Sequence, residues 1–79
     1  MFNIRNKLIK FRQNLGFTQK SIAELLGVSR TYINYIELGK AEGSISFWKT
    51  LQNKLCLPDE MVWQFMKEGV LIEEAKKAS

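Results

Sequence analysis

TQKSIAELLGVSRTYINYIELGK, residues 18–40, has the hydrophobic periodicity of two short helices joined by a tight turn. The apolar positions recur at helical spacing in both halves: Ile22, Leu25 and Leu26, then Ile33 and Ile36. The segment therefore predicts a pair of helices whose apolar faces share one core.

The ends of both helices are marked in the sequence as well. Thr18 and Ser29 are typical N-cap residues, because a short hydroxyl side chain can accept a hydrogen bond from a free helix amide. Gly27 and Gly39 follow the last apolar positions, where a left-handed residue commonly closes a helix. Ala23 is small where the two helices should cross, so they can approach each other closely.

The second helix leaves one outward face, with residues at i, i+1, i+4, i+5 and i+8: Arg30, Thr31, Asn34, Tyr35 and Leu38. The Arg30 fork can donate twice to guanine O6 and N7, and the Asn34 amide can pair with adenine N6 and N7. Thr31 offers a methyl group to thymine, and Tyr35 can stack on that base or reach a phosphate. These groups predict a surface that reads base edges in a major groove.

The segment resembles the helix-turn-helix of the phage Cro/C-repressor (XRE-like) family. That family has Gln at the start of the first helix, Ala four residues on, Gly in the turn, two aliphatic residues in the second helix and a closing Glu-x-Gly-Lys. The matching residues are Gln19, Ala23, Gly27, Ile33, Ile36 and Glu37-Leu38-Gly39-Lys40. The resemblance covers roughly residues 4 to 69. It implies an all-α, compact five-helix repressor-type domain, assigned to residues 1–69, that binds double-stranded DNA, usually as a dimer on a two-fold site.

The resemblance also implies roles for single residues. Arg12 takes the position of an arginine that forms a structural ion pair with Glu37, and base contacts fall on Arg30, Thr31, Asn34 and Tyr35. Helix N-termini and short polar caps are the usual partners of phosphate. DNA backbone contacts are therefore predicted at Thr18, Gln19, Ser29, Tyr32 and Lys40. The sequence departs from the family at Leu38 and Glu42. These two residues predict weaker contacts with the DNA backbone at the end of the second helix and in the loop that follows it.

Charge is distributed unevenly over the 79 residues, whose net charge is +4. Residues 1–40 hold seven Lys or Arg against two Glu, a net +5, and residues 41–79 hold five Lys against six acids, a net −1. The positive half contains the motif, as a phosphate-facing surface requires. The composition, 46% hydrophobic and 25% charged, is that of one small globular domain.

A further helix is predicted before the motif, from about Ile4 to Leu15. Its apolar stripe is Ile4, Leu8, Phe11 and Leu15, and Gly16 ends it. The cations off this stripe are expected in solvent or near the DNA backbone: Arg5, Lys7 and Lys10.

Two helices are predicted after the motif. Ser44 caps the first, Ile45–Leu55, whose aromatic pair Phe47-Trp48 is expected to pack in the core. Pro58 begins the second, which runs to about Lys67 and ends at Gly69.

Two apolar features fall outside the expected core. Trp63 lies off the apolar stripe of the last helix, as either an anchor for a partner subunit or an edge-of-core residue. Val70, Leu71 and Ile72 open a tail, residues 70–79, and this triplet either folds back on its own core or packs against a second copy. Dimer packing is favoured because family members usually bind two-fold sites as dimers.

The residue types argue against catalysis. There is no His, one Cys and no carboxylate cluster with a recognisable partner, so no enzyme activity, metal or cofactor is expected. Cys56 lies in an apolar run, is expected to act as a small apolar residue, and allows no internal disulfide, which favours a cytoplasmic location. No apolar run is near the roughly 18 residues of a membrane span, and no secretory leader is expected.

Two functions stay open. The first is a transcription regulator, a Cro-like repressor of a phage or mobile element that occupies a palindromic operator as a homodimer. The second is a protein-interaction module on the same fold, an antitoxin or antirepressor that acts through a regulatory protein partner. Trp63 and the Val70-Leu71-Ile72 triplet favour the second function.

Overall fold

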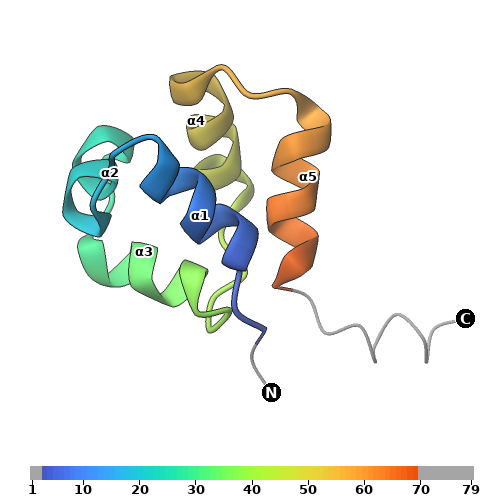
Figure 1. Cartoon of the computed structure of the whole chain (residues 1–79), viewed down its shortest axis with the longest axis horizontal. Coiled ribbons are helices and arrows are strands. Elements are labelled where there is room, and N and C mark those ends of the chain that lie inside the picture. Colours follow the sequence, from blue (N-terminus) through green and yellow to red (C-terminus); the bar gives the residue numbers. More distant parts are fainter. Residues whose placement is uncertain (1–2, 70–79) are drawn as a thin grey trace, which may run out of the picture.

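The computed structural model describes residues 3–69, which form five helices joined by short loops (Figure 1). They are α1 (Asn6–Asn14), α2 (Gln19–Leu26), α3 (Arg30–Glu37), α4 (Ile45–Leu55) and α5 (Asp59–Glu68). No strand occurs in this range, so the predicted all-α, five-helix fold is confirmed. None of the helices described is long and apolar enough to cross a membrane.

The predicted caps form at the N-termini of three helices. Thr18 Oγ1 accepts from the Ser21 amide at 3.0 Å and Ser21 Oγ accepts from the Thr18 amide at 2.9 Å, which makes a capping box for α2. Ser29 Oγ and Ser44 Oγ each accept from the amide three residues on, both at 3.0 Å. Gly27 closes α2 with φ at 73°, in the left-handed region where glycine is least strained.

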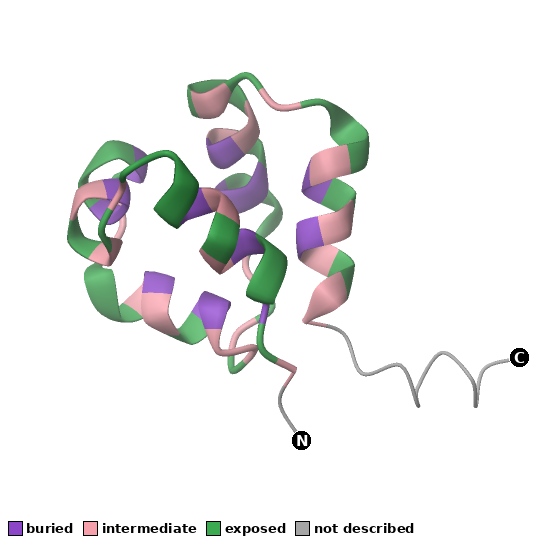
Figure 2. Ribbon diagram, viewed as in Figure 1, coloured by how far each residue is buried: buried purple, intermediate pink, exposed green. Residues whose placement is uncertain are grey.

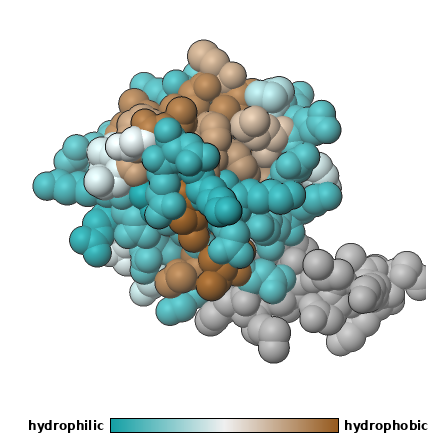
Figure 3. All heavy atoms as spheres, in the orientation of Figure 1, coloured by the Kyte–Doolittle hydropathy of each residue, from teal (hydrophilic) through white to brown (hydrophobic). Residues whose placement is uncertain are grey.

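The core fills the space between the five helices, where the buried residues in Figure 2 face one another. Every helix contributes to this set: Leu8, Ile22, Ala23, Leu26, Ile33, Ile36, Phe47, Trp48, Leu51, Val62 and Phe65. Hydrophilic residues cover much of the face in Figure 3, and apolar side chains gather in the upper part of the view and in a smaller group below the centre. The interior therefore holds α2 and α3 against the other three helices in a fixed arrangement.

The predicted first helix is too long at both ends. Ile4 precedes α1 and is 47% exposed, and Leu15, at the C-cap where the chain turns into Gly16, is 50% exposed. Leu25 of α2 was also expected on the apolar face and is 36% exposed, because the buried face of this short helix is completed by Ala23 and Leu26.

Cys56 also differs from the expectation. It is exposed rather than buried, because α4 ends at Leu55 and Cys56 follows as its C-cap with φ at 54°. The left-handed turn there directs the chain toward α5, so the residue lies at a surface corner.

The largest departure concerns Arg5, which is 1% exposed rather than solvated. Its guanidinium donates to five backbone carbonyl oxygens: Phe65 at 2.9 Å, Ile36 at 2.7 Å, Ala41 at 2.8 Å, Met66 at 3.2 Å and Glu42 at 3.4 Å. Three of these carbonyls, those of Ile36, Phe65 and Met66, belong to the last turns of α3 and α5, where the helix dipole favours a cation. Burial lowers the pKa of the Arg5 guanidinium, and the charges of Glu42 and Glu68 oppose that effect.

Candidate nucleic-acid interface

α3 has one buried side and one open side. Ile33 and Ile36 are 3% and 0% exposed and face the core. Opposite them, Arg30 and Thr31 are exposed, Tyr35 is exposed, Asn34 is half-buried and Leu38 at the C-cap is half-buried. The structure therefore brings the four predicted base-contacting residues, Arg30, Thr31, Asn34 and Tyr35, onto one helix.

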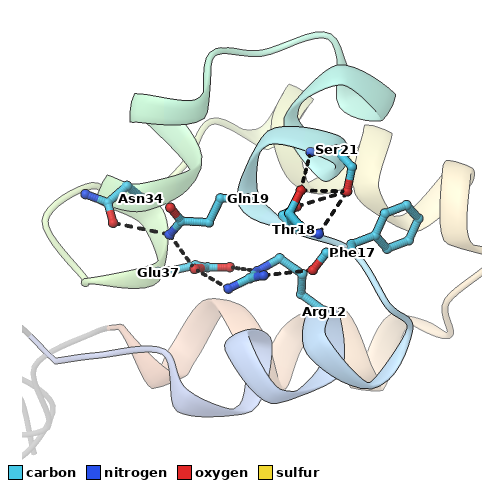
Figure 4. Close-up of polar contacts among 7 residues, drawn as sticks. All are labelled: Arg12, Phe17, Thr18, Gln19, Ser21, Asn34 and Glu37. Carbon is cyan, nitrogen blue, oxygen red and sulfur yellow. Dashed lines mark hydrogen bonds and ion pairs between the residues drawn. The ribbon is translucent and has the colours of Figure 1, made fainter.

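A buried ion pair sets the position of this helix. Arg12 Nε lies 2.6 Å from Glu37 Oε2, and Arg12 Nη2 donates to Glu37 Oε1 at 3.3 Å. The two side chains are 10% and 4% exposed. Arg12 Nη1 also donates to the Phe17 carbonyl at 2.8 Å, as Figure 4 shows. The predicted pair is present, and it links α1, α3 and the loop before α2.

Gln19 extends this cluster to the surface. Its Nε2 donates to Glu37 Oε1 at 3.0 Å and to Asn34 Oδ1 at 3.2 Å (Figure 4). The Gln19–Asn34 contact was not predicted from the sequence. The available signal was the spacing of Asn34 and Glu37, three residues apart, which places both on the side of α3 that faces the start of α2.

The other predicted backbone contacts also have structural partners. The Tyr32 hydroxyl accepts a hydrogen bond from the Ser44 amide at 3.1 Å. Its ring packs edge-on against the Phe47 ring, with 5.4 Å between the two ring centres. Lys40 Nζ lies 5.7 Å from the centre of the Tyr35 ring. Thr18 serves in the capping box of α2. Tyr32 and Thr18 thus shape the loops around α3 in addition to any contact with DNA.

An open hollow of about 620 Å³ lies beside the N-termini of α2 and α3. Its lining residues are Arg12, Gln13, Gly16, Phe17, Thr18, Gln19, Lys20 and Arg30. The first amides of α2 and α3 have no intrahelical acceptors, and helix N-termini attract anions. Two helix N-termini, Lys20 and Arg30 therefore converge on a recess suited to a phosphate group.

Burial changes which cations can face DNA. Arg5 and Arg12 are 1% and 8% exposed and serve the interior. The remaining five cations of residues 1–40 are exposed, against exposed Glu24: Lys7, Lys10, Lys20, Arg30 and Lys40. The positive excess of this half thus stays on the surface. In residues 3–69, no group of three or more His, Cys, Asp or Glu could hold a metal ion.

The predicted partner surface is described in part. Trp63 is 58% exposed and Ile45 is 72% exposed. They border a groove of about 280 Å³ between α4 and α5, which is also lined by Trp48, Lys49, Gln52, Asp59, Val62 and Met66. The Val70-Leu71-Ile72 triplet lies outside the described residues.

Comparison with known proteins gives one family match and one relative. A family profile described as helix-turn-helix matches residues 8–55, from α1 to the end of α4. The chain is 47% identical over 53 residues to a glutamine–fructose-6-phosphate aminotransferase (isomerizing) of Methanocaldococcus jannaschii, and the alignment covers 67% of this chain but 4% of that protein. No solved structure matches the chain.

Proposed function

The chain belongs to the Cro/C1-type helix-turn-helix family of DNA-binding transcription regulators, and from that premise we propose that it is a Cro-like repressor that occupies a palindromic operator as a dimer. The observation that carries the proposal is α3, whose buried side is fixed by the core and whose open side carries Arg30, Thr31, Asn34 and Tyr35. The aminotransferase of Methanocaldococcus jannaschii shares only 4% of its length with this chain, so its activity does not carry over.

Direct readout is assigned to the start of α3. Arg30 is its first residue, and a helix of this type enters the major groove with its N-terminal residues at the base edges. A guanidinium pairs best with guanine O6 and N7. Thr31 and Asn34 follow on the same face, and Tyr35 near the end of the helix contacts a thymine methyl group or the adjacent backbone.

Backbone contacts are assigned to the recess and to the two ends of α3. The first amides of α2, Thr18 and Lys20 are assigned to a phosphate in the recess, and Ser29 and Tyr32 to the DNA backbone near the start of α3. Lys40 contacts a second phosphate from beside Tyr35. Such contacts position the protein without reading sequence and make the affinity dependent on salt.

Dimerisation is assigned to the groove between α4 and α5. An exposed Trp beside an exposed Ile is a typical interface anchor, because aromatic side chains dominate the binding energy of interfaces. Lys49 and Asp59 on the same groove offer charges of both signs, which can pair across a self-complementary two-fold contact. The tail of residues 70–79 is proposed to add to this contact. Action on phage or mobile-element DNA in the cytoplasm completes the proposal, by family analogy.

The second candidate is the protein-interaction module. The exposed Trp63 favours it, because the same groove would serve a toxin or another regulatory protein. Antitoxins also bind DNA, so copurification of a distinct protein partner discriminates between the two candidates.

The experiment is selection of bound sites from a random duplex pool, with the wild type and with Arg30→Ala. We expect a palindrome with half-sites about one helical turn apart. Arg30→Ala should cost about 1–3 kcal/mol of discrimination at one base pair per half-site and leave the other preferences in place.

Lys20→Ala is the matched control, since it removes an exposed cation from the same recess. It should weaken binding to all DNA sequences alike and make the fall of log affinity with log salt shallower, by about 0.9 in slope. Binding that is salt-sensitive but selects no motif would contradict the repressor proposal and favour a protein partner.

A further inference from the structure

Gln19 lies between the interior ion pair and the reading face of α3. One amide group, Gln19 Nε2, donates both to Glu37 Oε1 at 3.0 Å and to Asn34 Oδ1 at 3.2 Å. Arg12 holds the other side of the same carboxylate at 2.6 Å. The four side chains form one continuous chain of polar contacts from the buried α1–α3 interface to the surface (Figure 4).

The direction of each hydrogen bond in this chain follows from the chemistry of Glu37. A carboxylate bonded to an arginine accepts hydrogen bonds and donates none. Gln19 must therefore turn its NH₂ group toward Glu37, because the opposite orientation would place Oε1 against a buried anion. An amide NH₂ group carries two hydrogens, and the two contacts of Gln19 Nε2 use both of them.

The same logic fixes Asn34. Its oxygen receives the second hydrogen of Gln19, so its nitrogen lies on the side away from Gln19, as Figure 4 shows. An unrestrained Asn side chain can present either its oxygen or its nitrogen to a base. Here Glu37 selects the orientation of Gln19, and Gln19 selects that of Asn34.

We propose that Gln19 is a positioning residue for sequence readout, which fixes the Asn34 amide so that α3 presents N–H donors at this point. The proposal rests on the proposed DNA-binding function. The base opposite Asn34 must then offer an acceptor, such as purine N7, guanine O6 or thymine O4. Cytosine presents only its N4 amino donor in the major groove and is disfavoured at that position.

This proposal revises the role predicted for Gln19 from sequence. A phosphate oxygen needs a donor, and both amide hydrogens of the Gln19 side chain are already used. Only the backbone amide of Gln19, at the first position of α2, remains suited to a phosphate. The side chain therefore acts on specificity, and the backbone acts on general affinity.

The test compares duplexes that differ only at the base pair whose preference is lost in Asn34→Ala, each carrying one of the four bases. In Gln19→Leu, the Asn34 amide is free to turn, and its oxygen can accept from cytosine N4. The ratio of affinities for the preferred base and for cytosine should fall by roughly tenfold. The preference at the base pair read by Arg30 should not change, and Lys20→Ala should leave all ratios as in the wild type.

Asn34→Asp gives an independent test at a half-buried position, and it serves if Gln19→Leu does not fold. Aspartate still accepts from Gln19 but offers only oxygens to the groove, so the preferred base at this position should change to cytosine. The added charge lowers affinity for every duplex, and the readout is therefore the ratio between duplexes.

Two results would overturn separate parts of the argument. If the wild type selects a site and Gln19→Leu weakens all four duplexes equally, Gln19 contacts only the backbone and the positioning role is wrong. If the wild type selects no site at all, the proposed operator binding fails, and the positioning role fails with it.

Discussion

Two buried arginines, Arg5 and Arg12, contact the last turn of α3, and they differ in the kind of group that accepts their hydrogen bonds. Arg12 faces the Glu37 carboxylate, so one cation meets one anion, and a single further bond goes to the Phe17 carbonyl. Arg5 meets carbonyl oxygens of the backbone, including that of Ile36, so one cation faces the partial charges of helix and loop ends. A side-chain partner can be replaced by mutation, whereas a backbone partner cannot. The Arg12 site can therefore be converted to an apolar contact, and the Arg5 site cannot.

The largest effect is expected for Arg12→Met. It leaves Glu37 buried without its cation, which should lower the free energy of unfolding by about 3–5 kcal/mol. The measurement is urea denaturation followed by circular dichroism. Arg12→Met combined with Glu37→Leu should recover most of that loss, because no unpaired charge remains. A double variant no more stable than Arg12→Met would contradict this account.

Arg5→Met should have the next largest effect, about 3 kcal/mol, because several buried carbonyls lose a charged donor at once. Arg5→Lys should recover only part of it, since an ammonium has three donors in place of a planar fork of five. The same denaturation experiment applies. Full stability in Arg5→Lys would show that the charge alone, rather than the five separate bonds, holds the two helix ends.

The smallest of the three effects is expected for Gly69→Ala. A Cβ atom at Gly69 would overlap the Arg5 guanidinium, so the substitution should cost about 1–2 kcal/mol. In an Arg5→Met background the cost should shrink, because the two residues are in contact. Gly16→Ala is the matched control. Its φ of 84° makes alanine strained there, but no atom crowds the added Cβ.

Gly16→Ala should therefore cost the same with and without Arg5. If Gly69→Ala lowers the free energy of unfolding equally in both backgrounds, the added Cβ does not clash with the Arg5 guanidinium.

The same comparison explains what sequence could predict. The caps at Thr18, Ser29 and Ser44 and the range of α4 were predictable, because a hydroxyl before an apolar periodic run is a local signal. The Arg12–Glu37 pair was predicted from the resemblance to the family, which implies an arginine and a glutamate paired at these two positions. Arg5 was not, because every residue carries a carbonyl and no residue type marks the one that accepts.

The other errors share a local cause. Ile4 and Leu15 have the right spacing for the stripe of α1, but the helix stops short of both, so their side chains leave the core. Cys56 looks apolar in sequence, but it stands at a corner after α4. The residues proposed to contact bases lie on α3, while the hydrogen bond from Gln19 to Asn34 is a contact between helices that has no direct local signal in the sequence.

The Arg5 contacts also bear on how the chain folds as it is synthesised. Arg5 and its acceptor Phe65 are 60 positions apart in sequence, and Met66 is 61 positions away. A nascent chain that ends before α5 would hold a nearly complete core with Arg5 lacking these acceptors. The bonds of Arg5 to these two carbonyls can form only after the last helix is made, whereas its bonds to the carbonyls of Ile36, Ala41 and Glu42 can form earlier. Contacts of such long sequence separation are also the ones that slow folding.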